Sequence, residues 1–438
     1  MKGESHLTDT PLSIPDLIAQ LSDANPAVRQ RVAKALRDTK PVEIIEPLIQ
    51  IAQSNADENS RNSALYALGM IGDVRVIPFL VSQMFDPVTG LEAALSLANL
   101  APSSIQPLMD VLADVQQPPA ARGYAVEGLG DCIFSDWVDH PAAKPPAMIE
   151  QITDALLKHL DDKEAGIRES CAYSLGWMGA KNAVPALIAR LQDPVFEVRR
   201  GAIDALGRLK DTQAIDPLIT CLNDPDALIR ACTAKVLGWF YNPKPAPYLL
   251  LALQDADGRV RAYAADSLGK LKVVPAVDLL IACLDDPTDD VRWHAAIALG
   301  QIRDPRAVEP LRNTLQRGTD RRTTFWCIWA LAELGDEATF QPLIDYLQSD
   351  PKYLRPITQA LGDLGNPTAF EPLMKAWMDN WNSHYFAIVD TLKKLDLPKA
   401  MAAFTALARD DNDPGRQQAA KNALQRLQGI DPDLPASS

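Results

Sequence analysis

The sequence lacks the short motifs that identify most nucleotide-binding proteins and hydrolases. Its 438 residues contain no Gly-x-x-x-x-Gly-Lys-Ser/Thr loop, no Gly-x-Gly-x-x-Gly fingerprint and no Gly-x-Ser-x-Gly elbow. Histidine is scarce, with five residues, and no two of them have the spacing of metal ligands. We therefore expect no metal, no permanently bound cofactor and no deep active site of standard design, and the sequence identifies no catalytic residue.

Cysteine is also scarce, and none of the six residues belongs to a Cys-x-x-Cys pair. We interpret all six as reduced, buried thiols of a cytoplasmic protein. The N-terminal segment has no apolar stretch of the kind that signal peptides carry. The longest apolar runs, such as Tyr248–Leu253, are far too short to cross a bilayer, so we expect no membrane insertion.

Basic residues are fewer than acidic residues. The chain carries 57 acidic against 43 basic side chains, a net charge of −14, and its pI is about 4.9. A protein that binds a nucleic acid duplex or an anionic membrane needs a basic footprint, because the partner's phosphates must be neutralised. The charge balance therefore disfavours nucleic acid as a partner.

The strongest positive signal is self-similarity at a period of 31 residues. Paired leucines, four residues apart as on one helix face, recur in phase from Leu187 and Leu191 to Leu311 and Leu315. Leu-Gly pairs recur from Leu175-Gly176 to Leu299-Gly300. Two charged columns keep the same phase, at Arg168, Arg199, Arg230, Arg261 and Arg292 and at Asp162, Asp193, Asp224, Asp255 and Asp286.

Each unit of this pattern reads as helix, tight turn, helix, turn. Neither helix has enough apolar area to be stable alone, so stacking of neighbouring units must supply the core. The sequence therefore predicts an all-α fold, a right-handed α-solenoid of about 13 HEAT-like hairpins. We expect the aspartates to cap helix N-termini and to bond arginines of the same or the adjacent unit, a structural ladder and not catalytic chemistry.

The phase of the repeat suggests a division of the chain. We expect N-terminal repeats over residues 1–130, an irregular insert or hinge over 131–148, C-terminal repeats over 149–428 and a tail over 429–438. The unit near residues 73–101 departs from the pattern, and there Glu92 is taken to replace the arginine.

In HEAT-type arrays the second helix of each hairpin lines the concave side. If Val198, Ala202 and Leu206 are buried, the residues on the opposite side of their helix face solvent, and adding the period extends that face along the chain. Large rings at exposed positions are typical of binding surfaces. If the helix phase is off by about 100°, the same rings are core instead. The predicted ligand- or partner-binding residues are Tyr173, Trp177, Arg200, Asp204, Trp239, Asp266, Lys270, Trp293, His294, Phe325, Trp326, Trp329 and Glu333.

The repeat Asp-Pro-x-x-x-Val-Arg-x-x-Ala-x-x-Ala-Leu-Gly resembles the HEAT-like repeats of phycobilisome lyases and their relatives in cyanobacteria. The stretch Phe325–Ala332 is similar to the aromatic stretch of E-type phycocyanin lyase subunits, with matches in character at Phe325, Trp326, Trp329 and Leu331. This resemblance implies a link to the biogenesis or turnover of phycobiliproteins. It also implies transient binding of phycocyanobilin, with aromatic walls against the pyrroles and basic groups on the propionates.

The sequence leaves two functions open. The first is a scaffold that binds a partner protein, such as a phycobiliprotein subunit, in the aromatic groove. The alternative is a bilin lyase of the E/F type, which attaches a bilin to a cysteine of an antenna subunit.

Overall fold

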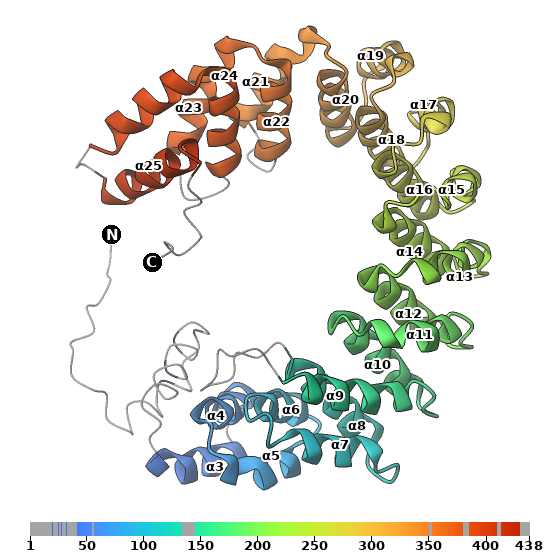
Figure 1. Ribbon diagram of the computed structural model, residues 1–438, viewed down its shortest axis with the longest axis vertical. Coiled ribbons are helices and arrows are strands. Elements are labelled where there is room, and N and C mark those ends of the chain that lie inside the picture. Colours follow the sequence, from blue (N-terminus) through green and yellow to red (C-terminus); the bar gives the residue numbers. More distant parts are fainter. Residues whose placement is uncertain are drawn as a thin grey trace. The chain divides into compact units, whose positions relative to one another are not determined.

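The computed structural model describes residues 42–54, 57–133, 145–349, 353–379, 385–409 and 413–429, together with the single residues 20, 25, 28 and 32. Within these ranges all regular structure is helical and no strand occurs, so the predicted all-α fold of stacked hairpins is confirmed (Figure 1). The chain divides into two compact units between Leu218 and Ile219. None of the described helices is both long enough and apolar enough to cross a membrane.

The described part of the first unit contains five helical hairpins, and several of them adjoin short 3-10 turns. Its elements are η1 (Val42–Ile44), α3 (Ile45–Gln53) and α4 (Glu58–Ile71); η2 (Val74–Val76), α5 (Ile77–Gln83) and α6 (Gly90–Ala98); α7 (Ile105–Ala113) and α8 (Pro119–Asp131); α9 (Pro146–His159) and α10 (Ala165–Trp177); and η3 (Lys181–Ala183), α11 (Val184–Arg190), α12 (Phe196–Leu209) and η4 (Thr212–Ala214). The predicted insert at 131–148 lies largely outside the described residues, and so do the expected first repeat and tail.

The second unit continues the pattern after α13 (Ile215–Thr220), the helix in which the division falls. Its elements are η5 (Cys221–Asn223), α14 (Ala227–Leu237) and η6 (Gly238–Phe240); α15 (Ala246–Ala252) and α16 (Gly258–Lys270); η7 (Val274–Ala276), α17 (Val277–Cys283) and α18 (Asp289–Ile302); η8 (Pro305–Ala307), α19 (Val308–Arg317) and α20 (Arg321–Glu333); η9 (Glu337–Thr339), α21 (Phe340–Ser349) and α22 (Leu354–Leu364); and η11 (Pro367–Ala369), α23 (Phe370–Asp379), α24 (Tyr385–Leu407) and α25 (Pro414–Leu427). Helix α24 is kinked at Asp396, two residues before Pro398.

The core lies between the two layers of each unit. The leading leucine of each pair, from Leu187 to Leu311, is fully buried, and so is the leucine of each Leu-Gly pair. Up to α23, the most extensive packing joins successive even-numbered helices, which form one layer, while the odd-numbered helices form the other (Figure 1). The alternation ends at the kink in α24, and α25 packs against α24. Glycine makes this approach possible: a Cβ on Gly176 would lie 2.5 Å from the Cα atom of Ala205 on the next even helix.

The Arg/Asp columns form the predicted ladder between repeats. Arg230 donates from Nε and Nη2 to both carboxylate oxygens of Asp255, 25 residues on, at 2.7 and 2.8 Å. Its Nη1 atom donates to the main-chain oxygen of Asp224, 2.9 Å away, in its own repeat. The same bonds recur at Arg168 and Arg261.

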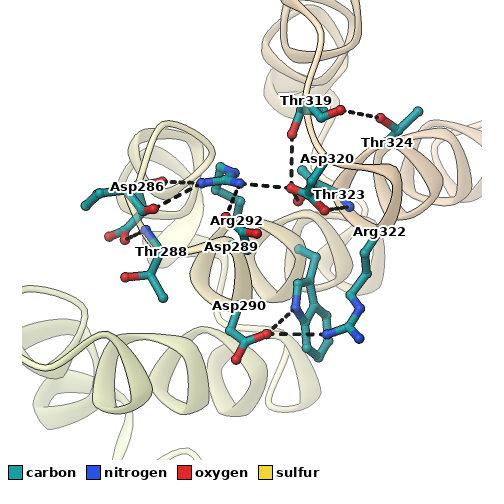
Figure 2. Close-up of polar contacts among 12 residues, drawn as sticks. Asp286, Thr288, Asp289, Asp290, Arg292, Thr319, Asp320, Arg322, Thr323 and Thr324 are labelled. Carbon is teal, nitrogen blue, oxygen red and sulfur yellow. Dashed lines mark hydrogen bonds and ion pairs between the residues drawn. The ribbon is translucent and has the colours of Figure 1, made fainter.

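The ladder changes at α18, where the period lengthens. Figure 2 shows Arg292 between the carboxylates of Asp289 and Asp320, and it also donates to the main-chain oxygen of Asp286 at 2.9 Å. Asp320 holds the start of α20 by accepting from the amide and the hydroxyl of Thr323.

The expected capping role of the column aspartates is wrong. The Asp255 carboxylate accepts from the amide of Asp257, and it is Asp257 that caps α16, by accepting from the amide of Arg259. The column aspartate therefore closes the Asp-Pro-type turn, and the residue two positions later occupies the N-cap position, where Asp226 and Asp257 cap their helices.

The departure near residues 73–101 has a different origin from the one expected. Gly90 precedes the buried Leu97 by seven residues, as Arg122 precedes Leu129, so Gly90 and not Glu92 takes the arginine position. A Cβ on Gly90 would lie 2.6 Å from the Tyr124 ring and 2.7 Å from a main-chain oxygen, so no arginine fits there.

Candidate functional site

The even-helix face of a unit is the set of side chains on its even-numbered helices that point away from the odd-numbered layer. Helix α12 tests the predicted phase directly. Val198, Ala202 and Leu206 are buried, whereas Arg200 is half-buried and Arg208 is exposed. The predicted phase is therefore correct for α12, and the even-helix face is where the sequence placed it.

The most exposed rings of this face lie on α10, in the first unit. Tyr173 is 46% exposed and Trp177 is 44% exposed, with ring centroids 5.8 Å apart. The Arg208 guanidinium, on α12, lies 3.7 Å from the centre of the Trp177 ring, a cation–π contact that holds the ring in place. The exposure that the sequence predicted for Tyr173 and Trp177 is confirmed.

Charged groups flank these rings. Arg200 on α12 pairs with Glu169 on α10 at 2.9 Å, and Asp204 is half-buried one turn further along α12. Tyrosine, tryptophan and arginine are the residues that most often dominate binding energy at protein interfaces. The surface of α10 and α12 therefore combines exposed rings with a fixed guanidinium and with charges of both signs.

In the second unit the predicted rings Trp239 and Trp293 are half-buried. The Lys235 amine lies 5.5 Å from the ring centres of both Trp239 and Tyr263, which come from successive repeats. On α16 the Lys270 amine pairs with Asp266 one turn away. These contacts keep the aliphatic stem of Lys235 over aromatic surface.

Helix α18 carries Trp293 and His294, stacked with ring centroids 3.5 Å apart. The Trp293 indole donates to the Asp290 carboxylate at 2.8 Å, and the Arg322 guanidinium lies over the ring at 5.3 Å while pairing with Asp290, as Figure 2 shows for the two charged groups. His294 donates from Nδ1 to the main-chain oxygen of Asp290, and burial lowers the pKa of its imidazole. His294 is therefore held neutral against Trp293.

The prediction that Phe325 and Trp329 face solvent is wrong, because they are 0% and 7% exposed. Tyr353 stacks on Phe325 at 3.9 Å, and Tyr346 of α21 meets the same ring edge-on. The Trp329 ring packs against Gly300 of α18, where a Cβ would lie 2.8 Å from it. Aromatic residues of the next repeat thus cover Phe325, whereas Trp293 at the corresponding position of the preceding repeat is half-buried.

Trp326 and Glu333 belong to the same packed region as Phe325 and Trp329. Trp326 is half-buried and meets Phe325 and Trp329 edge-on, at 5.0 and 5.5 Å. The Glu333 carboxylate is nearly buried and pairs with Arg303. The aromatic end of the predicted groove is therefore an inter-repeat core and not a binding wall.

Sequence reasoning missed an apolar cavity of about 670 Å³ on the even-helix face of α6, α8 and α10. The sequence does contain an indication of this cavity. Leu91 and Leu95 are apolar residues at positions that point to the even-helix face when Gly90 takes the arginine position. With Glu92 in the arginine position, these leucines are not placed on that face. The lining residues are Leu91, Leu95, Pro119, Ala120, Gly123, Tyr124, Glu127, Glu164, Gly166, Ile167 and Ser170.

Carboxylates on α6 and α8 lie in an unusual electrostatic environment. Burial, with a smaller contribution from the nearby Asp131 carboxylate, raises the pKa of Glu92 to about 7. Burial also raises the pKa of Glu127, again with Asp131 contributing, while a hydrogen bond from the Ser170 hydroxyl opposes the shift. Burial therefore disfavours the charged form of both carboxyls, and a cation placed beside either one would lower its pKa again.

A second cavity, of about 360 Å³, lies on α22, α24 and α25 of the second unit, where Arg426 pairs bidentately with Asp390. Among the described residues no three His, Cys, Asp or Glu side chains are placed to hold a metal ion. The cysteines in the described ranges include the fully buried Cys171 and Cys327, while Cys232 is half-buried.

Comparison with known proteins gives one family. The HEAT-repeat family matches residues 14–101, 105–202, 184–269, 247–332, 277–357 and 349–425. No curated protein matches the chain.

Several solved structures are similar to this chain at low sequence identity. Kap95 in its complex with Nup1 is 15% identical with a TM-score of 0.59, over 95% of this chain and 66% of that one. The complex of CpcE and CpcF of phycocyanin lyase from Nostoc sp. PCC7120 is 20% identical with a TM-score of 0.38, over 67% of this chain and 98% of that one. YibA of Escherichia coli is 24% identical with a TM-score of 0.40, over 59% and 98%.

Proposed function

The chain belongs to the HEAT-repeat family, and from this premise we propose that it is a scaffold that binds a partner protein on the even-helix face of α10 and α12. The observation that carries the proposal is the arrangement of Tyr173, Trp177 and Arg208. Stacked helical repeats offer extended surfaces of this kind to other proteins. No reaction is required of the surface, since it holds a partner through rings and paired charges.

The physical argument concerns the energy of burying these rings. Tyr173 and Trp177 each leave almost half of their surface in water, so a partner that covers them gains apolar burial without any rearrangement of the core. Arg208 already fixes the Trp177 ring, so little side-chain entropy is lost on binding. Arg200, paired with Glu169, offers a charged rim beside the rings.

We propose a phycobiliprotein subunit as the partner and the cytoplasm as the location, on the resemblance of the repeat unit to those of phycobilisome lyases. The alternative function, attachment of a bilin to a cysteine of that subunit, rested on the stretch Phe325–Ala332. Phe325 and Trp329 are buried within it, so these two rings do not offer the bilin a wall. A transient phycocyanobilin is therefore the second candidate ligand, and the experiment below separates it from the first.

The test is a calorimetric titration of the full chain with apo-phycocyanin subunits, with and without phycocyanobilin. We expect the subunit to bind without the bilin, and Trp177→Ala to weaken binding by ~2 kcal/mol, as for an aromatic hot spot. The matched control is Tyr248→Ala, since Tyr248 is also 46% exposed but lies on the odd-numbered helix α15. Binding that needs phycocyanobilin, with covalent transfer to the subunit, would favour the lyase function. Equal losses for both variants would contradict the proposed surface.

A further inference from the structure

The apolar cavity on the even-helix face of the first unit has three helical walls. Leu91 and Leu95 come from α6, Gly123 and Tyr124 from α8, and Ile167 from α10. Its volume of about 670 Å³ is enough for several aliphatic side chains. Leu91 is 44% exposed at its mouth, so apolar surface continues from the cavity onto the rim.

The depth of the cavity comes from one small residue. The nearest atom to a Cβ on Gly123 would be Ile167 Cδ1, 4.0 Å away, so the space above this glycine is open. On α10 the corresponding face position is held by Glu169. The helix axis is therefore accessible at Gly123 without any strained contact.

Acidic groups accompany the apolar walls. Glu127 and Ser170 both lie on the wall, and Glu164 lies at the α10 end. Among the described residues no arginine or lysine forms an ion pair with Glu127, whereas Glu164 has Lys163 at 4.0 Å. Charge complementarity therefore calls for a cation beside an apolar group.

The walls also select the backbone form of the occupant. The main-chain groups of α6, α8 and α10 are engaged along these helices, so the walls offer few partners to the amides and carbonyls of an extended peptide. A helix satisfies its own main-chain groups and needs only side-chain contacts. An amphipathic helix thus fits the cavity better than a strand.

We propose that this cavity receives the apolar side chains of an amphipathic helix of a protein partner, with a lysine or arginine of that helix paired with Glu127. The proposal rests on the proposed scaffold function and deepens it, because it names the recognition element of the partner. It concerns a different set of residues from Tyr173, Trp177 and Arg208, so the two can fail separately.

The probe is a pair of fluorescent helical peptides of about 18 residues, long enough to form helix. Both carry leucine at i, i+3, i+4 and i+7 on one face. One has lysine beside that face, and the other has glutamate at the same positions. Anisotropy titrations with the full chain should show at least tenfold tighter binding of the lysine peptide. Equal binding of the two peptides, or no binding of either, would overturn the proposal.

Two variants with matched controls locate the site. Gly123→Leu should fill the cavity and weaken binding of the lysine peptide at least tenfold, while Ala189→Leu, on the exposed side of α11, should leave it within twofold. Glu127→Gln should lower the affinity for the lysine peptide several-fold and leave the affinity for the glutamate peptide unchanged or higher. Glu150→Gln, at an exposed position on α9, should change neither affinity. Unchanged binding in Glu127→Gln contradicts the pairing even if Gly123→Leu fails to fold.

The outcomes separate this inference from the proposed function. Trp177→Ala should change the affinity for the peptide by less than twofold, whereas it should weaken binding of the phycocyanin subunit. If the peptide binds as expected and the subunit does not, the identity of the partner is wrong and the cavity stands. If the subunit binds through Trp177 while Gly123→Leu has no effect on the peptide, the cavity assignment is wrong and the scaffold stands.

Discussion

Tyr353 stacks on Phe325 with ring centroids 3.9 Å apart and an interplanar angle of 17°, and this contact turns a predicted surface position into core. The two residues belong to successive repeats of the second unit. Phe325 stands where the preceding repeat has the half-buried Trp293. A ring that is half-buried in one repeat is therefore fully covered in the next.

The first prediction concerns this cover. Trp329→Ala should lower the free energy of unfolding by ~3–5 kcal/mol, because it leaves a cavity against Gly300. Trp177→Ala should lower it by less than about 1 kcal/mol, since truncating an exposed ring leaves no cavity. Chemical denaturation of both variants, monitored by circular dichroism, provides the comparison. Equal stability of the two variants would show that Trp329 is not core.

The same residues show how far the sequence could predict the site. Periodicity alone identified the hairpins, the buried leucines and the exposure of Tyr173 and Trp177, because each depends on contacts that every repeat makes. The burial of Phe325 depends on Tyr353 and Tyr346, which occupy no column of the repeat. The cavity at Gly123 depends on which residues of α6 face it. This phase is hard to recognise from the sequence because Gly90 stands where other repeats have the arginine. Periodicity therefore cannot predict contacts that are made in one repeat only.

The second prediction concerns the ladder between repeats. Arg230→Ala should destabilise the fold by ~1–3 kcal/mol, since it leaves the Asp255 carboxylate without its bidentate donor. Affinity for a partner on the α10–α12 surface should stay within twofold. Thermal melts and the calorimetric titration test both statements. The control is Arg230→Lys, which keeps the positive charge but cannot form the bidentate pair with Asp255. A normal melt with lost binding would instead make the column functional.

The third prediction concerns pH. The pKa of Glu92 is raised to about 7 in the folded chain, above its usual value of 4.5, so the folded state holds the proton more tightly than the unfolded state. Its contribution to stability is complete below pH 4.5 and is lost as pH rises through 7. Glu92→Gln should therefore gain ~1–2 kcal/mol over the unmodified chain between pH 5 and 8, by removing that loss. Parallel slopes of stability against pH for the two proteins would contradict this assignment.

The fourth prediction concerns thiol reactivity. Burial raises the pKa of Cys283 to about 11 and that of Cys327 to about 12, so neither forms the reactive thiolate near neutral pH. Cys232 is half-buried and should react first with a thiol-specific chromogenic reagent at pH 7.5, while the other two react only on unfolding. Mass spectrometry of the labelled peptides identifies the order. Rapid labelling of Cys327 in the folded chain would show that α20 opens readily.

The central claim is that a protein partner covers the rings of α10. Hydroxyl-radical footprinting of the full chain, alone and with apo-phycocyanin, reads this surface directly because oxidation of aromatic side chains follows their exposure. We predict that the partner reduces oxidation of Tyr173 and Trp177 and leaves the exposed Tyr248, on α15, unchanged. Formation of the complex with undiminished oxidation of Tyr173 and Trp177 would contradict the account.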